Sequence, residues 1–413
     1  MNSNKRRSNK IKRPTPWIYL PLVGLTNIYT RFVKQHKFYG REAIKELVKE
    51  PLLVIGNHTS FYDFLYMARI FYPHRINFVV AAKYFRFRGL SLVFRLAQAI
   101  PKNLFSADIR TVSRSAAIIK QGGIVGIYPE GQISLGGITL PLPEGIGKLV
   151  KYLDVPVVAI KTLGGGFVDP PWSERHRRGI VESHVSIVLY KEQLQAMTSE
   201  AIDTALKDAL AADPYQWVNE NRNEYTGKEL ADGLTNLLYI CPHCHGEFTL
   251  VTKANQLKCE NCEMEVTLSG CGEFSWQTTQ DYFKHLGEWY QWQHQYEEEV
   301  ALADMNYSYT LPVELAMYRR KGDGIEAVGS GTMTIHRDQY IYKGGCRGEE
   351  VQMEFPLRII RYVPFDGGRN FQIYTNNELH EFRPNPGVKS VKAALVGEAM
   401  YQLQTKKDGK PKK

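Results

Sequence analysis

The chain has 413 residues, which is too long for a single hydrophobic core, so two or three domains are expected. Hydrophobic residues make up 43% and charged residues 23%, a composition that excludes general disorder. The net charge of +9 is concentrated at the two ends, in residues 1–13 and in the tail from Lys406. Basic ends suit an anionic surface, either nucleic acid or the negative leaflet of a membrane.

The N-terminal residues 1–16 are predicted to be a disordered basic arm, and residues 17–35 to contain an apolar helix. The apolar run contains Pro21 and is soon followed by Arg31 and Lys34, so it is short for a spanning helix. No signal-peptide cleavage pattern follows it. Aromatic and aliphatic residues between basic flanks are typical of a helix in the membrane interface. We expect interface binding, with a core helix or a true span as the alternatives.

Between residues 50 and 192, short apolar runs alternate with helical patterns. The runs predicted as buried strands are Leu52–Ile55, Phe78–Ala81, Ile124–Tyr128, Val155–Ile160 and Ser186–Tyr190. Helical spacing of apolar residues is found at 65–71, 112–120 and 199–211. This alternation predicts an α/β domain over residues 17–235, with a central, mostly parallel sheet flanked by helices.

His58 follows the first of these strands directly, and Asp63 lies five residues further along the chain. Within one regular helix, five residues would leave the two side chains roughly 140° apart. We therefore expect His58 in the loop after the strand and Asp63 in the first turns of the next helix. Asp63 can then orient the imidazole, whose other nitrogen removes a proton from a hydroxyl group. Such a base without a serine nucleophile suits direct transfer to an alcohol.

Four of the six cysteines form two C-x-x-C pairs separated by fourteen residues: Cys241 and Cys244, then Cys259 and Cys262. This spacing predicts a zinc ribbon over residues 236–272, in which four thiolates bind one structural Zn²⁺. A closed shell of four protein ligands leaves no catalytic position. Acidic residues outnumber basic ones between Cys241 and Glu265, so the ribbon is not expected to bind nucleic acid.

The sequence pattern changes in the C-terminal third of the chain. Residues 273–307 are predicted to be a helical linker, and short alternating runs with Gly and Asn turns follow from residue 308. The strands predicted there are Thr332–His336, Gln339–Tyr342, Val351–Phe355, Ile359–Val363, Phe371–Tyr374 and Glu378–Phe382. With a helix at 388–403, residues 308–405 are expected to form a small antiparallel β domain closed by a C-terminal helix. That arrangement resembles the pleckstrin-homology-like architecture; residues 406–413 remain as a basic tail.

Three segments, taken together, are characteristic of one protein family. Residues 57–63 read Asn-His-Thr-Ser-Phe-Tyr-Asp, residues 128–131 read Tyr-Pro-Glu-Gly, and a Val-Pro strand begins at Val155. In this order and spacing they resemble the glycerolipid acyltransferases related to bacterial 1-acylglycerol-3-phosphate acyltransferase, over residues 17–192. The resemblance implies that His58 is the general base and Asp63 its orienting partner. It also implies an acyl thioester of coenzyme A or acyl carrier protein as the donor, and a lysophospholipid hydroxyl as the acceptor.

The acceptor side departs from the family pattern. The resemblance implies that Tyr128, Pro129, Glu130 and Gly131 shape the acceptor and oxyanion side, although Glu130 is equally a candidate for bracing the site. The arginine of the family's Pro-Glu-Gly-Thr-Arg-Ser block is Ile133 here, which cannot pair with a phosphate. A phosphate clamp is predicted instead from other cations: Lys83, Lys102 or Arg110. Because of Ile133, the sequence does not identify the acceptor lipid, whereas the expectation of acyl transfer is little affected.

The leading hypothesis is an O-acyltransferase of phospholipid biosynthesis, peripheral on the cytoplasmic face of the cell membrane. Its expected partners are anionic membrane lipids and the acyl thioester, and no nucleic acid. The alternative is a non-catalytic zinc-ribbon adaptor or lipid-binding protein that retains an acyltransferase fold. Nucleic-acid binding through the basic ends is a third and weaker hypothesis.

Overall fold

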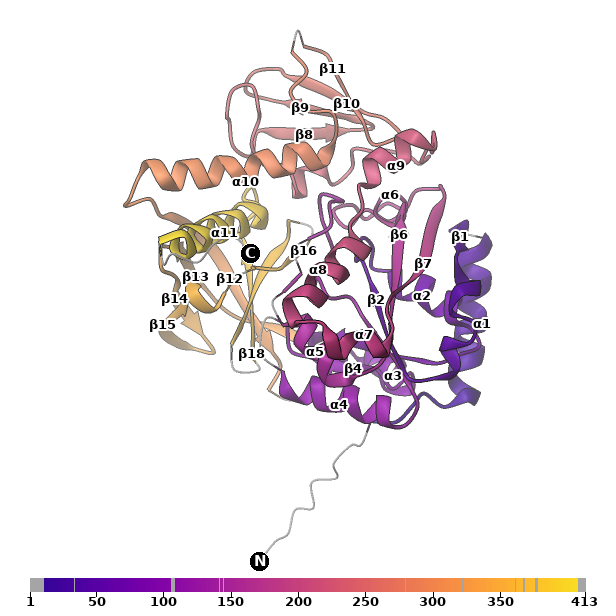
Figure 1. Cartoon of the computed structure of the whole chain (residues 1–413). Helices are drawn as coiled ribbons and strands as arrows, with labels where there is room; N and C mark the ends of the chain where they lie inside the picture. The colour runs from indigo at the N-terminus through magenta and orange to yellow at the C-terminus, as the bar shows by residue number, and fades with distance from the viewer. Residues whose placement is uncertain are drawn as a thin grey trace, which may run out of the picture.

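The computed structural model describes residues 11–407 except 33, 105–107, 141, 144, 279, 321–322, 361, 367 and 376–377. It consists of an α/β domain, a small sheet with the four cysteines, a long helix and a C-terminal β domain (Figure 1). Most of the predicted basic arm (1–10) and tail (408–413) lies outside the described residues.

The α/β domain is built on a seven-stranded sheet with the order β1-β7-β6-β2-β5-β3-β4. Its strands are His36–Tyr39 (β1), Leu52–Gly56 (β2), Ile76–Ala81 (β3), Ile100–Lys102 (β4), Ile124–Ile127 (β5), Val157–Leu163 (β6) and Val181–Leu189 (β7). All neighbouring strands pair in parallel except β6 and β7, which are antiparallel. The predicted central, mostly parallel sheet is therefore confirmed.

Helices cover both faces of this sheet, as the burial of the central strand shows. They are Pro16–Phe32 (α1), Asp63–Phe71 (α2), Arg88–Leu96 (α3), Ile109–Lys120 (α4), Ile146–Leu153 (α5), Gly165–Val168 (α6), Lys191–Ala196 (α7), Ser199–Leu210 (α8) and Pro214–Glu220 (α9). Leu52 and Val54 of β2 pack in one core with α1 and α2. Leu53 and Ile55 pack in another with α4, α5 and α8. Because successive strand residues point to opposite faces, a continuous apolar run serves both cores.

The cysteine ribbon is a four-stranded antiparallel sheet with the order β11-β10-β9-β8. Its strands are Leu250–Lys253 (β8), Gln256–Cys259 (β9), Glu265–Leu268 (β10) and Phe274–Trp276 (β11). The spacing of the cysteines also predicts a hairpin with a first strand at Gly246–Val251, and the hairpin is present, but its first strand begins at Leu250. The preceding residues form a tight turn instead, in which the Cys241 N–H donates to the Gly246 carbonyl at 3.0 Å. β11 extends the sheet beyond residue 272, and the linker helix is Leu286–Ala303 (α10).

The C-terminal β domain has seven antiparallel strands in the order β15-β14-β13-β12-β18-β17-β16. They are Tyr309–Tyr318 (β12), Ile325–Ile335 (β13), Gln339–Cys346 (β14), Glu349–Pro356 (β15), Phe365–Asp366 (β16), Asn370–Thr375 (β17) and Glu378–Pro384 (β18), and Ser390–Lys407 (α11) closes them. The antiparallel sheet and terminal helix are as expected. The pleckstrin-homology-like resemblance stays a prediction.

One predicted strand in this domain was wrong, and one strand was not predicted. In the segment 359–363, the described residues (all but 361) form no strand, because a 3₁₀ turn at Leu357–Ile359 runs into a loop. The buried residues of this turn and loop are Leu357, Ile360 and Val363. They are three residues apart, as in a 3₁₀ turn, whereas a strand buries every second residue. Strand β12 was not predicted, although Leu311, Val313 and Leu315 alternate into the core. Its Pro312 is unusual in a strand paired on both sides.

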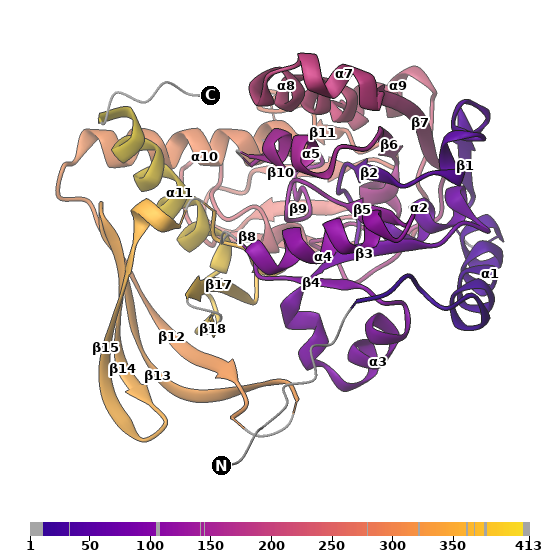
Figure 2. The ribbon, with the colours of Figure 1, turned by 60° about the horizontal axis from the view of Figure 1, so that its bottom comes forward.

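Helices α10 and α11 join the β domain to the ribbon, and Figure 2 shows them packed together. The buried Lys392 of α11 donates to the Glu247 carboxylate of the ribbon, with an Nζ–Oε2 distance of 2.6 Å. On α10, His294 lies between Glu298 and Glu398, with nitrogen–oxygen distances of 3.5 and 3.3 Å. Burial lowers the pKa of His294, but the hydrogen bonds and charges of these two glutamates outweigh it and raise the pKa to about 9.

This ion pair predicts a pH-dependent contribution to stability. A histidine whose folded pKa exceeds its unfolded value stabilises the fold fully below about pH 6.5, and loses that contribution as pH rises through about 9. We expect His294→Gln to lower the free energy of unfolding by about 2 kcal/mol at pH 6 and by almost nothing at pH 9.5. Denaturant titrations of both proteins measure this, and a difference that is constant with pH would contradict the assignment.

Candidate active site

The candidate catalytic residues gather at one edge of the parallel sheet. His58 follows β2, Lys83 follows β3, Lys102 ends β4, and residues 128–131 follow β5. These four strands run parallel, so their carboxyl ends meet at the same edge. Ligand sites of open α/β sheets form at that edge.

His58 and Asp63 form a hydrogen-bonded pair, with 2.9 Å between His58 Nδ1 and Asp63 Oδ2. His58 lies in the loop and Asp63 is the first residue of α2, the placement that their spacing predicted. The same Oδ2 accepts the backbone N–H groups of Thr59, at 2.7 Å, and Ser60, at 2.9 Å. A carboxylate held in this way keeps the proton on Nδ1 and leaves Nε2 free to act as a base.

A glycine of the β6–β7 connection packs against this pair. A Cβ atom on Gly165 would lie 2.8 Å from Thr59 Oγ1 and 3.2 Å from Asp63 Oδ1. Only glycine therefore lets α6 approach the loop so closely. The sequence analysis did not identify Gly165, because a contact of this kind has no local pattern.

Glu130 braces the His58 loop from the opposite side. Its carboxylate accepts the His58 backbone N–H at 2.8 Å and the Leu140 N–H at 3.0 Å. Burial raises the pKa of Glu130 to about 7, against the lowering effect of these two hydrogen bonds. The Tyr128 ring stacks on the His58 ring with centroids 4.6 Å apart. Of the two roles open for Glu130, these contacts favour bracing.

A cavity of about 1130 Å³ opens in front of His58. Tyr128, Pro129, Glu130 and Gly131 all line it, as do Lys83, Lys102 and Ile133. A large part of its wall is apolar and comes from α1, β3 and α3: Leu22, Val23, Phe78, Val79, Val80, Val93 and Phe94. The His58 imidazole therefore lies beside an apolar chamber.

Lys83 and Lys102 are the two lysines of this cavity. They are close neighbours, because Ala81 pairs with Lys102 where β3 and β4 end. Neither makes an ion pair with any carboxylate that the structure describes, and burial lowers the pKa of both ammonium groups. Arg110, the third predicted phosphate ligand, is exposed on α4 and does not line the cavity.

A second histidine–aspartate pair at the cavity was missed by the sequence analysis. Asp169 Oδ1 contacts His176 Nδ1 at 2.6 Å and also accepts from the buried Lys34 Nζ. Both Asp169 and His176 line the cavity. Lys34 and Asp169 are 135 residues apart, so no spacing within the sequence indicated the contact.

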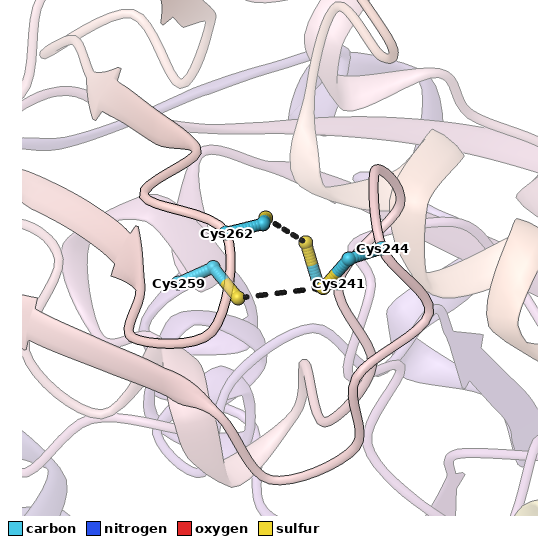
Figure 3. A group of neighbouring side chains, drawn as sticks. All are labelled: Cys241, Cys244, Cys259 and Cys262. Atoms are coloured by element: carbon cyan, nitrogen blue, oxygen red, sulfur yellow. Dashed lines mark hydrogen bonds between the residues drawn. The ribbon is translucent and has the colours of Figure 1, made fainter.

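The four predicted metal ligands converge (Figure 3). Their sulfur atoms all lie within 4.8 Å of one another, and Cys241–Cys262 and Cys244–Cys259 are each 3.7 Å apart. Four sulfurs around a tetrahedral Zn²⁺, each about 2.3 Å from the metal, would be roughly 3.8 Å apart. The cluster therefore fits one tetrahedral ion, and it has no place for a substrate.

Comparisons with known proteins give a family match over the segment that carries the candidate site. Residues 35–162 match the model of the Acyltransferase family, a segment that includes His58, Asp63 and Glu130. None of the curated proteins compared with the chain matches it. A similar solved structure is the 1-acyl-sn-glycerophosphate (LPA) acyltransferase PlsC from Thermotoga maritima, with 16% identity over 49% of this chain and 79% of that chain, and a TM-score of 0.41. The ribbon and the β domain lie outside the family match.

Metal binding at the cysteines is expected to support folding. We expect the native protein to bind one zinc ion per chain. The double variant Cys244→Ser/Cys262→Ser should lose the metal, and its free energy of unfolding should fall by several kcal/mol. Elemental analysis and denaturant titration measure both effects. Cys346→Ser, outside the cluster, serves as the control and should keep the metal. A zinc-free native protein, or a double variant of unchanged stability, would refute the assignment.

Proposed function

We propose that this chain, whose residues 35–162 form an acyltransferase domain, moves a fatty acyl chain from an acyl thioester to the hydroxyl of a lysophospholipid. One observation carries the proposal: the His58–Asp63 pair lies at the wall of a cavity of about 1130 Å³ that is largely apolar. A base beside an apolar chamber suits a reaction whose two substrates both carry fatty chains.

The chemistry follows from the orientation of the imidazole. Nε2 of His58 removes the proton of the acceptor hydroxyl, and the oxygen attacks the thioester carbonyl carbon. The tetrahedral intermediate collapses and the carbon–sulfur bond breaks. The leaving sulfur takes the proton from the imidazolium, which gives a free thiol and restores the neutral His58. Asp63 stabilises the charged ring throughout, and Glu130 fixes the loop through the His58 N–H.

The substrates can be assigned to parts of the cavity. The apolar walls from α1, β3 and α3 suit an acyl chain, and Lys83 and Lys102 suit the phosphate of the acceptor. The donor is a thioester of coenzyme A or acyl carrier protein, whose polar carrier remains outside the apolar wall. The cysteine ribbon with its Zn²⁺ is structural.

We further propose that the protein is peripheral on the cytoplasmic face of the membrane. None of the described helices is both long enough and apolar enough to cross a membrane. Helix α1 buries Tyr19, Val23 and Thr30, while its other face exposes apolar side chains: Trp17 (90% exposed), Leu25 (68%), Ile28 and Phe32. Leu92 and Val93 of α3 are also exposed. A helix with one face on the core and one apolar face outside suits the membrane interface.

Catalysis is tested by replacing the base. We expect His58→Ala to reduce acyl transfer by 10³-fold or more, and Asp63→Asn by on the order of 10²–10⁴-fold, because the wrong nitrogen is then protonated. Transfer of labelled acyl groups to a panel of lysolipids measures this. His184→Ala, exposed on β7, is the matched control. Undiminished activity in His58→Ala would show that His58 is not the base, and no transfer by the unmodified protein would support the non-catalytic adaptor instead.

Membrane attachment is tested on the exposed face of α1. The variant Trp17→Ser/Leu25→Ser/Ile28→Ser should bind anionic vesicles at least about tenfold more weakly, because each side chain loses the free energy of leaving water. Vesicle sedimentation measures the binding. Leu302→Ser, which removes an exposed leucine from α10, is the control. Unchanged binding of the triple variant would count against this surface.

A further inference from the structure

The C-terminal β domain forms part of the wall of the catalytic cavity. In Figures 1 and 2, β18 lies beside the α/β domain. The cavity that contains His58 is also lined by residues of this domain: Ile325, Tyr362, Pro364, Phe365, Asp366, Gln372 and Glu381. The family match ends at residue 162, so this wall is an addition to the acyltransferase domain.

A buried glutamine connects the two domains at the cavity. Gln372 is only 4% exposed, and its Oε1 accepts from Lys83 Nζ at 3.2 Å and from the Tyr374 hydroxyl at 2.9 Å. Its amide nitrogen donates to Glu381 Oε2 at 3.2 Å. One proposed phosphate ligand, Lys83, is thus positioned by a side chain of the β domain. The guanidinium of Arg86 also lies 5.0 Å from the Tyr318 ring centroid across the same boundary.

Two lysines and six carboxylate side chains line the cavity wall, the latter being Asp108, Glu130, Asp169, Glu174, Asp366 and Glu381. Four of these carboxylates are paired with cations outside the wall: Asp169 with Lys34, Glu174 and Asp366 with Arg369, and Glu381 with Arg383. Asp366 and Glu381 act on Lys83 from the β domain and raise its pKa, against the larger lowering effect of burial. A phosphate monoester with two negative charges would meet these carboxylates beside Lys83. A phosphodiester with one negative charge and an attached ammonium group would match both signs.

We propose that the β domain recognises the acceptor head group, and that the acceptor is a lysophospholipid whose phosphodiester carries a protonated amine. Its phosphate contacts Lys83 and Lys102, and its ammonium group contacts Asp366 and Glu381. The inference rests on the proposed function, because it names the acceptor of the same site. Ile133 fits it, since a singly charged phosphate needs fewer cations than a doubly charged one.

Binding to the full chain carrying His58→Ala separates recognition from catalysis. The ligands are lysophosphatidylethanolamine, lysophosphatidylglycerol and lysophosphatidate with the same acyl chain, each titrated in one detergent. We expect the amine-bearing lipid to bind about tenfold more tightly than the other two. Adding Asp366→Asn should reduce that preference by most of this factor, whereas Glu349→Gln, on the exposed strand β15, should leave it unchanged.

The outcomes are distinct. Equal or tighter binding of lysophosphatidate or the glycerol-bearing lipid would overturn the inference, as would a preference unaffected by Asp366→Asn. Glu381 is buried and paired with Arg383 at 2.8 Å, whereas Asp366 is exposed and 3.4 Å from Arg369, so Asp366 is the safer position for a variant that must fold. Transfer assays with the unmodified protein complete the test. Preferred binding of the amine without transfer to any lysolipid would refute the proposed function alone, and transfer favouring lysophosphatidate would refute the head-group inference alone.

Discussion

One carboxylate oxygen organises the site. Asp63 Oδ2 accepts the imidazole N–H of His58 and the backbone N–H groups of Thr59 and Ser60. It thereby closes the loop between strand β2 and helix α2 and fixes the histidine tautomer from a single buried position. The Glu130 carboxylate, which follows β5, accepts the His58 backbone N–H, so this loop cannot move away from the cavity without breaking both sets of bonds. Fold and chemistry depend on the same few hydrogen bonds.

Features formed by residues close together in the sequence were predictable, whereas contacts between residues far apart in the sequence were not. The His58–Asp63 pair and the two C-x-x-C turns are local, so spacing alone places them. The centre of the parallel sheet was predictable because β2, β3, β5 and β6 are largely apolar runs, whereas the short outer strands β1 and β4 are not and were not predicted. The contact of Lys83 with Gln372 spans 289 residues, and that of Asp169 with Lys34 spans 135, so no periodicity indicates them. The missed strand β12 and the misassigned 359–363 show that short apolar runs are ambiguous where turns intervene.

The ribbon contributes to the site indirectly. It holds Glu247 against Lys392 of α11, and α11 packs on the strands that carry Gln372 and Asp366. Glu297 of α10 adds a hydrogen bond from the buried Tyr239 hydroxyl, just before the first cysteine. The four-cysteine cluster is thus connected to the cavity wall through packed helices and buried polar contacts, and none of its cysteines lines the cavity.

The position of Gln372 in the chain has a consequence for synthesis. Residues 35–162, with their base, emerge from the ribosome long before the strand that holds Lys83 in place. A nascent or truncated chain would therefore carry His58 and Asp63 with a cavity open on one side. On the proposed function, selection among acceptors requires that translation has passed β18 and that the long-range contacts have formed, so fidelity would be a property of the finished polypeptide.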